Sequence, residues 1–294
     1  MSSTGSIACV GLDPRPELIP PSIVEEAVRR HGDSPEAVAA AFVETNIAII
    51  GAVAGHCAAV KPQAACYEAY GVAGWHALEE TVRHANTAGI EVIVDAKRGD
   101  FGGVAPHYRQ AFFGGAPLLK GRPFSAMPAD WITANPYLGS DNIIALAAER
   151  AGDHGLFVLV KNSNPSSEEV QAVATANGTV AETVARLVDR WGSGRAGEGG
   201  LSDIGAVVGA TYPGEAKTLR LAMPDAMFLV PGYGAQGADA AAALAGLRPD
   251  GRGVLVSSSR GITGAWRDAG APGTWLEAAR DALDVMNDEL NAHR

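Results

Sequence analysis

Four ionisable side chains of alternating sign have the spacing of a reaction centre. Asp95, Lys97 and Asp100 follow the β-branched apolar run at residues 91–94, and Lys61 follows an earlier apolar run. Side chains two residues apart on a strand point to the same face, so Asp95 and Lys97 are expected to lie side by side. Two nearby carboxylates resist joint ionisation unless cations separate them, and interleaved lysines would keep all four groups charged.

Such a network can do chemistry if it is assembled before a substrate arrives. It would stabilise charge that develops in a transition state, and a lysine within it could deliver a proton as a general acid. A salt-bridged strand end with no catalytic role would have the same residue pattern. These four residues alone therefore leave both interpretations open.

A second set of residues indicates a phosphate site. The segments 231–237 (PGYGAQG) and 258–261 (SSRG) each follow an apolar run. Glycines let backbone N–H groups approach phosphate oxygens, and the Arg260 guanidinium could donate paired, charge-assisted hydrogen bonds to the same oxygens. Arg260 as a simple surface ion-pair residue is the alternative. Ser163 could exchange hydrogen bonds with an amide-like ring, although Asn162 and Asn164 beside it are by themselves more typical of a turn.

The elements that must position these residues alternate regularly along the chain. Apolar runs of strand length occur at 7–12, 57–62, 91–94, 131–135, 156–160, 204–209, 227–230 and 253–256. Helical segments separate them, with start signals at Ser34 followed by Pro35, at Ser140, and in the capping box Thr274-x-x-Glu277.

Eight such units predict a single-domain α/β fold, a (β/α)8 TIM barrel over residues 1–294, since this fold commonly takes about 250 residues. An open doubly wound sheet fits eight equal units less well. The candidate functional residues stand at or just after the carboxyl ends of the predicted strands. Active sites of this fold lie at that face, and its phosphate sites recur after strands seven and eight.

Composition limits the partners and the cellular location. Hydrophobic residues make up 47% and charged residues 19% of 294 residues, which is typical of a soluble globular protein. A formal net charge of −10 disfavours nucleic acid and anionic membranes as partners. The start of the chain lacks a basic signal-peptide region, and the longest apolar stretch, 47–60, falls short of a membrane span. A cytoplasmic protein is therefore expected.

Several other chemistries lack their residue patterns. Cys9, Cys57 and Cys66 have no C-x-x-C spacing and are expected to be buried reduced thiols. The histidines form no H-E-x-x-H pattern, and neither a G-x-S-x-G elbow nor a strand-adjacent G-x-G-x-x-G is present. The sequence therefore predicts no metal and no organic cofactor.

The motifs taken together resemble a known enzyme family. The segment 95–100, DAKRGD, matches the D-x-K-x-x-D signature of the orotidine 5′-monophosphate decarboxylase family. The resemblance extends over about residues 7 to 265 and includes the segments 61–63, 135–139, 163–165, 231–237 and 258–261. It is most similar to the bacterial class with the DAKRGD motif, the type 2 subfamily.

The resemblance implies a reaction and a role for each charged residue. The family converts orotidine 5′-monophosphate to uridine 5′-monophosphate in de novo pyrimidine biosynthesis without a cofactor. Lys97 resembles the proton donor to C6 of the pyrimidine, and Asp95 the aspartate placed against the substrate carboxylate. Lys61 joins this charge network. Asp100 resembles the aspartate that reaches the partner subunit's site, which implies a homodimer with shared active sites.

The same resemblance implies the substrate-binding residues. Asp13 and Lys61 resemble the contacts to the ribose hydroxyls, and Ser163 the contact to the pyrimidine. Gln236 and Arg260 resemble phosphate-binding residues on a closing loop. The matching motifs also include Asn135, Pro231 and Ser259.

This chain departs from the family pattern at a few positions. Phe101, Gly103 and Val104 stand where the pattern has Ile and then a nearby Ser or Thr, and Val104 cannot donate a hydroxyl to the ribose. Asn162 stands where this class often has Thr.

Two rival functions share parts of the pattern. Mg²⁺-dependent sugar-phosphate decarboxylases and aldolases of the same superfamily use a second-strand Glu as a metal ligand, where this chain has Lys61. A non-catalytic binder of nucleotide phosphates would predict loss of Lys97 or Asp95, and both are present.

Overall fold

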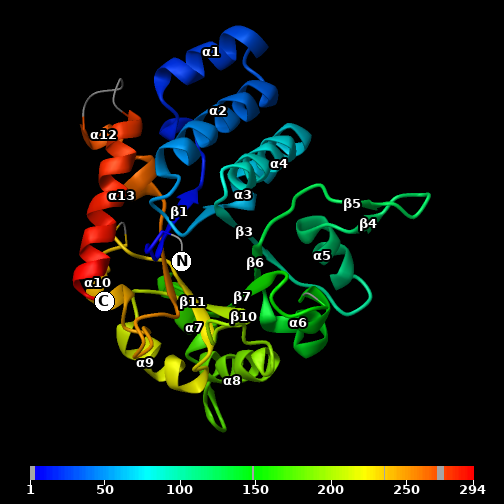
Figure 1. Ribbon diagram of the computed structural model, residues 1–294, viewed down its shortest axis with the longest axis vertical. Helices are drawn as coiled ribbons and strands as arrows, with labels where there is room; N and C mark the ends of the chain where they lie inside the picture. Colours follow the sequence, from blue (N-terminus) through cyan, green and yellow to red (C-terminus); the bar gives the residue numbers. More distant parts are fainter. Residues whose placement is uncertain (1–3, 148, 235, 270–274) are drawn as a thin grey trace. The chain divides into compact units, whose positions relative to one another are not determined.

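Eight parallel strands form a closed barrel, which confirms the predicted fold class. A computed structural model describes residues 4–147, 149–234, 236–269 and 275–294 (Figure 1). The barrel strands are β1 (Ala8–Leu12), β2 (Ala59–Pro62), β3 (Glu91–Arg98), β6 (Trp131–Ala134), β7 (Gly155–Lys161), β10 (Ser202–Val208), β11 (Ala226–Val230) and β12 (Val254–Ser258). Around the barrel each strand neighbours the next one in the sequence.

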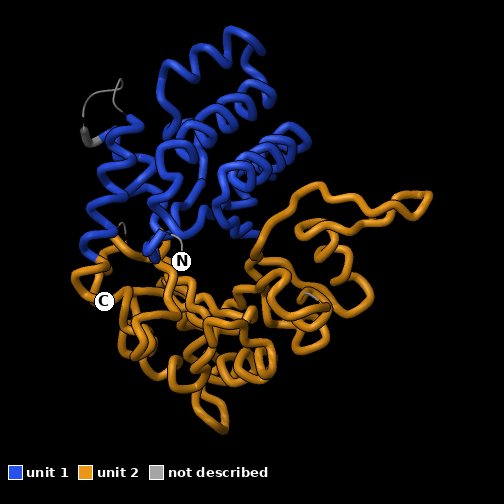
Figure 2. The backbone as a smooth tube through the Cα atoms, viewed as in Figure 1, with its two compact units in different colours: residues 1–96, 258–289 blue, residues 97–257, 290–294 orange. Residues whose placement is uncertain are grey.

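Helices provide the crossovers that parallel strands require. They are α1 (Pro21–His31), α2 (Pro35–Val53), α3 (Ala64–Glu68), α4 (Gly71–Thr87), α5 (Ala105–Phe113), α6 (Ser140–Leu146), α7 (Glu168–Gln171), α8 (Val180–Gly192), α9 (Pro213–Ala222), α10 (Ala240–Ala243), α11 (Arg260–Thr263), α12 (Trp266–Ala269) and α13 (Trp275–Ala292). The chain divides into two compact units, residues 1–96 with 258–289 and residues 97–257 with 290–294 (Figure 2).

The first unit contains β1, β2 and most of β3, with α2 packed against both α1 and α4. The sequence predicted the start of α2 correctly, because the Ser34 hydroxyl accepts a hydrogen bond from the Ala37 N–H at 3.2 Å. On its inner face α2 buries Phe42, Ile49 and Ile50. The apolar surface of α2 thus contributes to the core of this unit.

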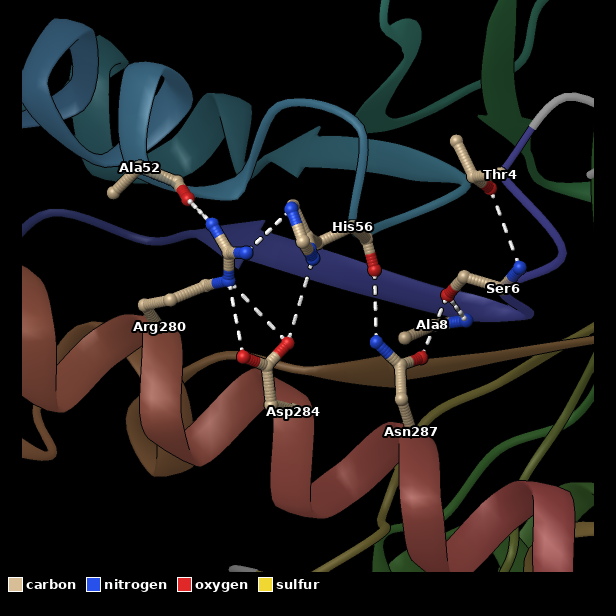
Figure 3. Close-up of polar contacts among 8 residues, drawn as sticks. All are labelled: Thr4, Ser6, Ala8, Ala52, His56, Arg280, Asp284 and Asn287. Atoms are coloured by element: carbon tan, nitrogen blue, oxygen red, sulfur yellow. Dashed lines mark hydrogen bonds and ion pairs between the residues drawn. The ribbon is translucent and has the colours of Figure 1, made fainter.

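Hydrogen bonds from side chains of α13 hold this helix against the segment that leads into β1 (Figure 3). Asn287 on α13 accepts a hydrogen bond from the Ser6 hydroxyl at 2.7 Å and donates one to the His56 carbonyl at 2.8 Å. Arg280 donates to the Ala52 carbonyl at the end of α2 at 3.0 Å. Residues near both ends of the chain are therefore joined within one unit.

The second unit contains β6, β7, β10, β11 and most of β12. A capping box begins α8, in which the Glu182 N–H donates to the Thr179 hydroxyl and the Glu182 carboxylate accepts from the Thr179 N–H. Arg220 on α9 is buried and donates to the carbonyls of Gly246, Ala226 and Gly253, which fastens α9 to β11 and the start of β12. Burial lowers the pKa of Arg220 to about 10.

Several boundaries differ from the sequence expectation. Ser140 is the first residue of α6 rather than its N-cap, and its hydroxyl accepts a hydrogen bond from the Trp191 indole at 2.9 Å. The helix ends at Leu146. The predicted cap at Thr274 lies outside the described residues.

Other differences concern short elements that periodicity does not reveal. The connector at 114–129 contains a hairpin of β4 (Ala116–Pro117) and β5 (Pro123–Phe124), and a second one joins β8 (Ala174–Thr175) to β9 (Gly178–Thr179). The strand predicted at 91–94 is longer in the structure, where β3 runs from Glu91 to Arg98. The Ala-rich segment after β11 forms only the four residues of α10.

One helix in the described ranges, α2, is long and apolar enough to cross a membrane by length and composition. This differs from the expectation that the longest apolar stretch is too short. Half of its most apolar window is buried inside the protein, and core helices of soluble proteins meet the same criteria.

Candidate active site

Three charged side chains meet at the carboxyl ends of β1, β2 and β3 in the first unit. The Lys61 ammonium lies 3.0 Å from an Asp95 carboxylate oxygen and 4.0 Å from Asp13. Gln63 donates a hydrogen bond to the same Asp95 oxygen at 3.0 Å. The register explains this proximity, since β1 pairs with β2 in parallel, β2 pairs with β3, and Gln63 forms a bridge with Asp95.

The electrostatics of this cluster keep Lys61 charged. Lys61 is 6% exposed and Asp95 is 8% exposed. Burial acts to lower the pKa of Lys61, but the charges of Asp95 and Asp13 outweigh it and the pKa is raised above its usual value. The cation is therefore retained in a largely buried position.

Asp13 offers an unused acceptor in the same cluster. Its Oδ1 atom is buried and has no hydrogen-bond partner among the residues that the structure describes. A buried carboxylate oxygen in this state is costly unless a donor reaches it. A ligand hydroxyl is a donor of suitable size and chemistry.

Ser259 and Arg260 also belong to the first unit. Ser259 lies against β1, where a Cβ atom at Gly11 would come within 1.8 Å of the Ser259 hydroxyl oxygen. Only glycine at position 11 gives that hydroxyl its space. Arg260 is exposed and is the first residue of α11.

Lys97 in the second unit has an unusual backbone conformation. Its φ is +48°, the one positive value among the described non-glycine residues. Its N–H donates to the buried Thr133 hydroxyl of β6 at 2.8 Å. Non-glycine residues in this region are strained, and such strain concentrates at functional sites. The expectation that Asp95 and Lys97 share a face assumed extended backbone, which Lys97 does not have.

A buried asparagine organises the turn that follows Lys97. Asn142 accepts a hydrogen bond from the Asp100 N–H at 2.9 Å and donates to the Asn135 carbonyl at 2.8 Å. A Cβ atom at Gly99 would lie 3.1 Å from that carbonyl oxygen, so the turn passes close to it. The Asp100 carboxylate accepts from the Phe101 N–H at 2.8 Å. Asp100 and Asn135 are thus held by one side chain, and Asn135 itself is exposed.

Ser163 and Gln236 flank one glycine of the second unit. A Cβ atom at Gly232, next to Pro231, would lie 3.4 Å from the Ser163 Cβ and 3.5 Å from the Gln236 Oε1. The backbone of Gly232 has a φ of +105°, which favours glycine. The predicted pyrimidine and phosphate residues of this unit therefore lie near each other.

The predicted residues thus fall into three groups. Asp13, Lys61 and Asp95 form an ion-pair cluster; Lys97 and Asp100 stand on either side of a turn held by Asn142; and Ser163, Pro231 and Gln236 gather around Gly232. Ser259 and Arg260 follow β12, and Ser259 lies against Gly11.

Sequence reasoning missed the residues that support these groups. Gln63, Thr133 and Asn142 each place a charged residue or its backbone through one hydrogen bond. Gln63 and Thr133 stand at strand ends, a position that favours functional residues in this fold. Asn142 lies within a helix and gives no such signal.

Among residues 4–147, 149–234, 236–269 and 275–294, no group of three or more His, Cys, Asp or Glu side chains has the arrangement of a metal site.

Comparison with known proteins identifies the family. The family described as "Orotidine 5'-phosphate decarboxylase / HUMPS family" matches residues 7–271. The chain belongs to this family. The family predicted from the sequence motifs is therefore confirmed.

Individual relatives cover nearly the whole chain. An orotidine 5'-phosphate decarboxylase of Rhodopirellula baltica is 41% identical over 98% of this chain and 95% of its own length. One of Haloarcula marismortui is 38% identical over 100% of this chain and 96% of its own. The solved OMP decarboxylase of Leishmania donovani has a TM-score of 0.74 and 33% identity, covering 98% of this chain and 93% of that one.

The raised pKa of Lys61 predicts how the ion-pair cluster responds to alkali. In the folded protein Lys61 keeps its proton above the pH at which the unfolded chain loses it, about 10.4. The stabilising contribution of the pair is then fully present below that pH and is lost as pH rises through the folded-state pKa. We expect the free energy of unfolding, relative to a Lys61→Met/Asp95→Asn variant, to be constant from about pH 7 to 9 and to fall above about pH 10.4.

Urea unfolding of both proteins across this range gives the measurement. Burial raises the pKa of Cys57 to about 12 and also raises that of Cys66. Both thiols titrate in both proteins, so the difference between the proteins isolates the pair. A difference that already declines between pH 7 and 9 would show that Lys61 is not held as a cation.

Proposed function

We propose that this protein decarboxylates orotidine 5′-monophosphate to uridine 5′-monophosphate without a cofactor, in de novo pyrimidine biosynthesis. Its relatives are named as decarboxylases, which are carboxy-lyases. The observation that carries the proposal is the buried Lys61–Asp95 ion pair with Asp13 beside it. A preformed set of fixed charges is what a reaction through a carbanion requires.

The chemistry follows from the charges in this proposal. Cleavage of the bond between C6 and the carboxylate releases CO₂ and leaves an electron pair on C6. The Lys97 ammonium offsets that charge and then transfers a proton to C6, and water later reprotonates the lysine. Asp95 stands against the departing carboxylate, while Lys61 keeps Asp95 ionised by pairing with it at 3.0 Å.

Substrate binding is assigned to the remaining residues. The Asp13 Oδ1 atom, which makes no hydrogen bond to the described residues, accepts one from a ribose hydroxyl. Ser163 contacts the pyrimidine. Asn135, which directly follows the preceding barrel strand β6, is also assigned to substrate binding. Pro231, Gln236, Ser259 and Arg260 bind the phosphate. Binding energy from the phosphate, remote from C6, then helps to assemble the site.

The rival functions fit the first unit less well. A Mg²⁺-dependent sister enzyme needs a ligand on the second strand, where the Lys61 cation already compensates the Asp95 carboxylate. A non-catalytic binder would have no use for the strained backbone at Lys97. Neither alternative explains both features.

The direct test is the loss of orotidine monophosphate absorbance when the purified protein is added in the presence of EDTA. We expect full activity, because no step uses a metal. Activity that appears only after Mg²⁺ is restored would favour the metal-dependent class. Binding of uridine monophosphate with no turnover under either condition would favour the non-catalytic binder.

Replacing the proposed acid separates chemistry from binding. We expect Lys97→Ala to lower turnover by at least about 10³-fold, since it removes both the offsetting charge and the proton donor. Uridine monophosphate should still bind, and this can be measured by calorimetry. Lys120→Ala, at an exposed hairpin position, is the matched control and should keep wild-type turnover. Turnover retained in Lys97→Ala would remove Lys97 as the acid.

The proposed homodimer with shared sites makes a complementation prediction. Asp100→Ala and Lys97→Ala proteins should each be inactive, because each lacks one charged group of every site. An equimolar mixture should regain up to about one quarter of wild-type activity, since about half of its dimers are mixed and each mixed dimer has one site with both intact residues. Mass spectrometry of the mixture checks subunit exchange. Verified exchange without recovered activity would contradict sites built from two subunits.

A further inference from the structure

The second unit buries a lysine that none of the roles above uses. Lys161 is the last residue of β7, and its side chain is 0% exposed. It stands two residues before Ser163, at the strand end where this fold places functional residues. A fully buried ammonium group is costly, so its surroundings must explain why it is there.

Two residues at the start of α9 compensate the charge of Lys161. The ammonium lies 3.1 Å from a carboxylate oxygen of Glu215 and 4.1 Å from the centre of the Tyr212 ring. The Glu215 contact lacks hydrogen-bond alignment, and Nζ makes no hydrogen bond to the described residues. Charge attraction and the cation–π contact therefore hold the lysine, and both tie the end of β7 to the start of α9.

The connection that these partners fix is the one that touches Ser163. Thr211, in the same β10–α9 connection, donates its hydroxyl hydrogen bond to the Ser163 carbonyl at 3.2 Å. A Cβ atom at Gly209 would come within 2.8 Å of the Ser163 Cα, so the two backbones are in close contact. The Gly209 N–H also donates to the Lys161 carbonyl at 2.7 Å. Residues 161 to 163 are thus held by residues 209 to 215 through two hydrogen bonds, a close backbone contact, an ion pair and a cation–π contact.

We infer that Lys161 is a positioning residue for substrate recognition: through Glu215 and Tyr212 it locks the β10–α9 connection against β7 and thereby sets the position of Ser163. Lys161 itself touches no substrate. This inference rests on the proposed function, in which Ser163 contacts the pyrimidine ring. Its consequence is selective, because loosening Ser163 weakens contacts to the base and leaves contacts to ribose phosphate intact.

Two probe ligands distinguish positioning from general stability. Uridine monophosphate carries the base, and ribose 5-phosphate lacks it. In Lys161→Met, which keeps an unbranched side chain of similar length but removes the charge, we expect the dissociation constant of uridine monophosphate to rise about tenfold, the equivalent of about one hydrogen bond. That of ribose 5-phosphate should stay within about twofold. Calorimetry or competition measures both.

Arg220→Met is the matched control. It also removes a buried cation from the second unit. Arg220, however, lies in the last turn of α9, at the opposite end from Tyr212 and Glu215, and donates to backbone carbonyls. It should lower the urea midpoint and change the two dissociation constants by the same small factor. If Lys161→Met unfolds, Tyr212→Leu keeps the ion pair and should show the same base-selective loss at smaller size.

A double-mutant cycle tests the route through Ser163. In a Ser163→Ala background, Lys161→Met should add less than about twofold to the loss of uridine monophosphate affinity, because the contact it positions is already gone. Equal weakening of both ligands, no weakening, or full additivity with Ser163→Ala would overturn the inference. These are binding measurements, so they stand apart from the turnover assay. If the wild-type protein binds both ligands but does not decarboxylate orotidine monophosphate, the proposed reaction is contradicted. The inference about Lys161 is still decided by the binding measurements.

Discussion

The buried ion pair between Lys61 and Asp95 is the interaction on which the first unit's site depends. Two ionised groups removed from water are each several kcal/mol unfavourable unless geometry lets one compensate the other. Here the parallel pairing of β1, β2 and β3 supplies that geometry at 3.0 Å, and Gln63 adds a hydrogen bond to the same carboxylate. The pair retains the Lys61 cation in a buried position, which a hydrophobic strand end could not do.

The second unit holds Lys97 and Asp100 through a strained backbone and two buried polar side chains. Lys97 is held at a φ of +48° with its N–H bound to Thr133, and the turn to Asp100 is bound to Asn142. Holding a residue in that region costs about 1–3 kcal/mol, so the surrounding hydrogen bonds must fix it. Rigid placement of a charged group before the reaction reduces reorganisation when charge develops.

The second unit uses the same means twice to place polar groups. A buried side chain with a single charge or amide fixes a loop that carries a half-buried candidate site residue: Asn142 for Asp100, and Lys161 with Glu215 for the segment at Ser163. Glycine then permits close approach at Gly11, beside Ser259, and at Gly209, beside Ser163. The candidate site residues are therefore placed by side chains one layer beneath them.

The sequence by itself determined the eight-unit alternation, the cap at Ser34, the family, and which strand ends carry charge, because hydrophobic periodicity and short motifs are local properties. It did not reveal the hairpin of β4 and β5 or the left-handed backbone of Lys97. Only the tertiary structure decided that Asn142 and Lys161 are buried beside functional segments, since their partners lie far away in sequence. Burial and compensation of a charge are set by packing, and no spacing along the chain encodes them.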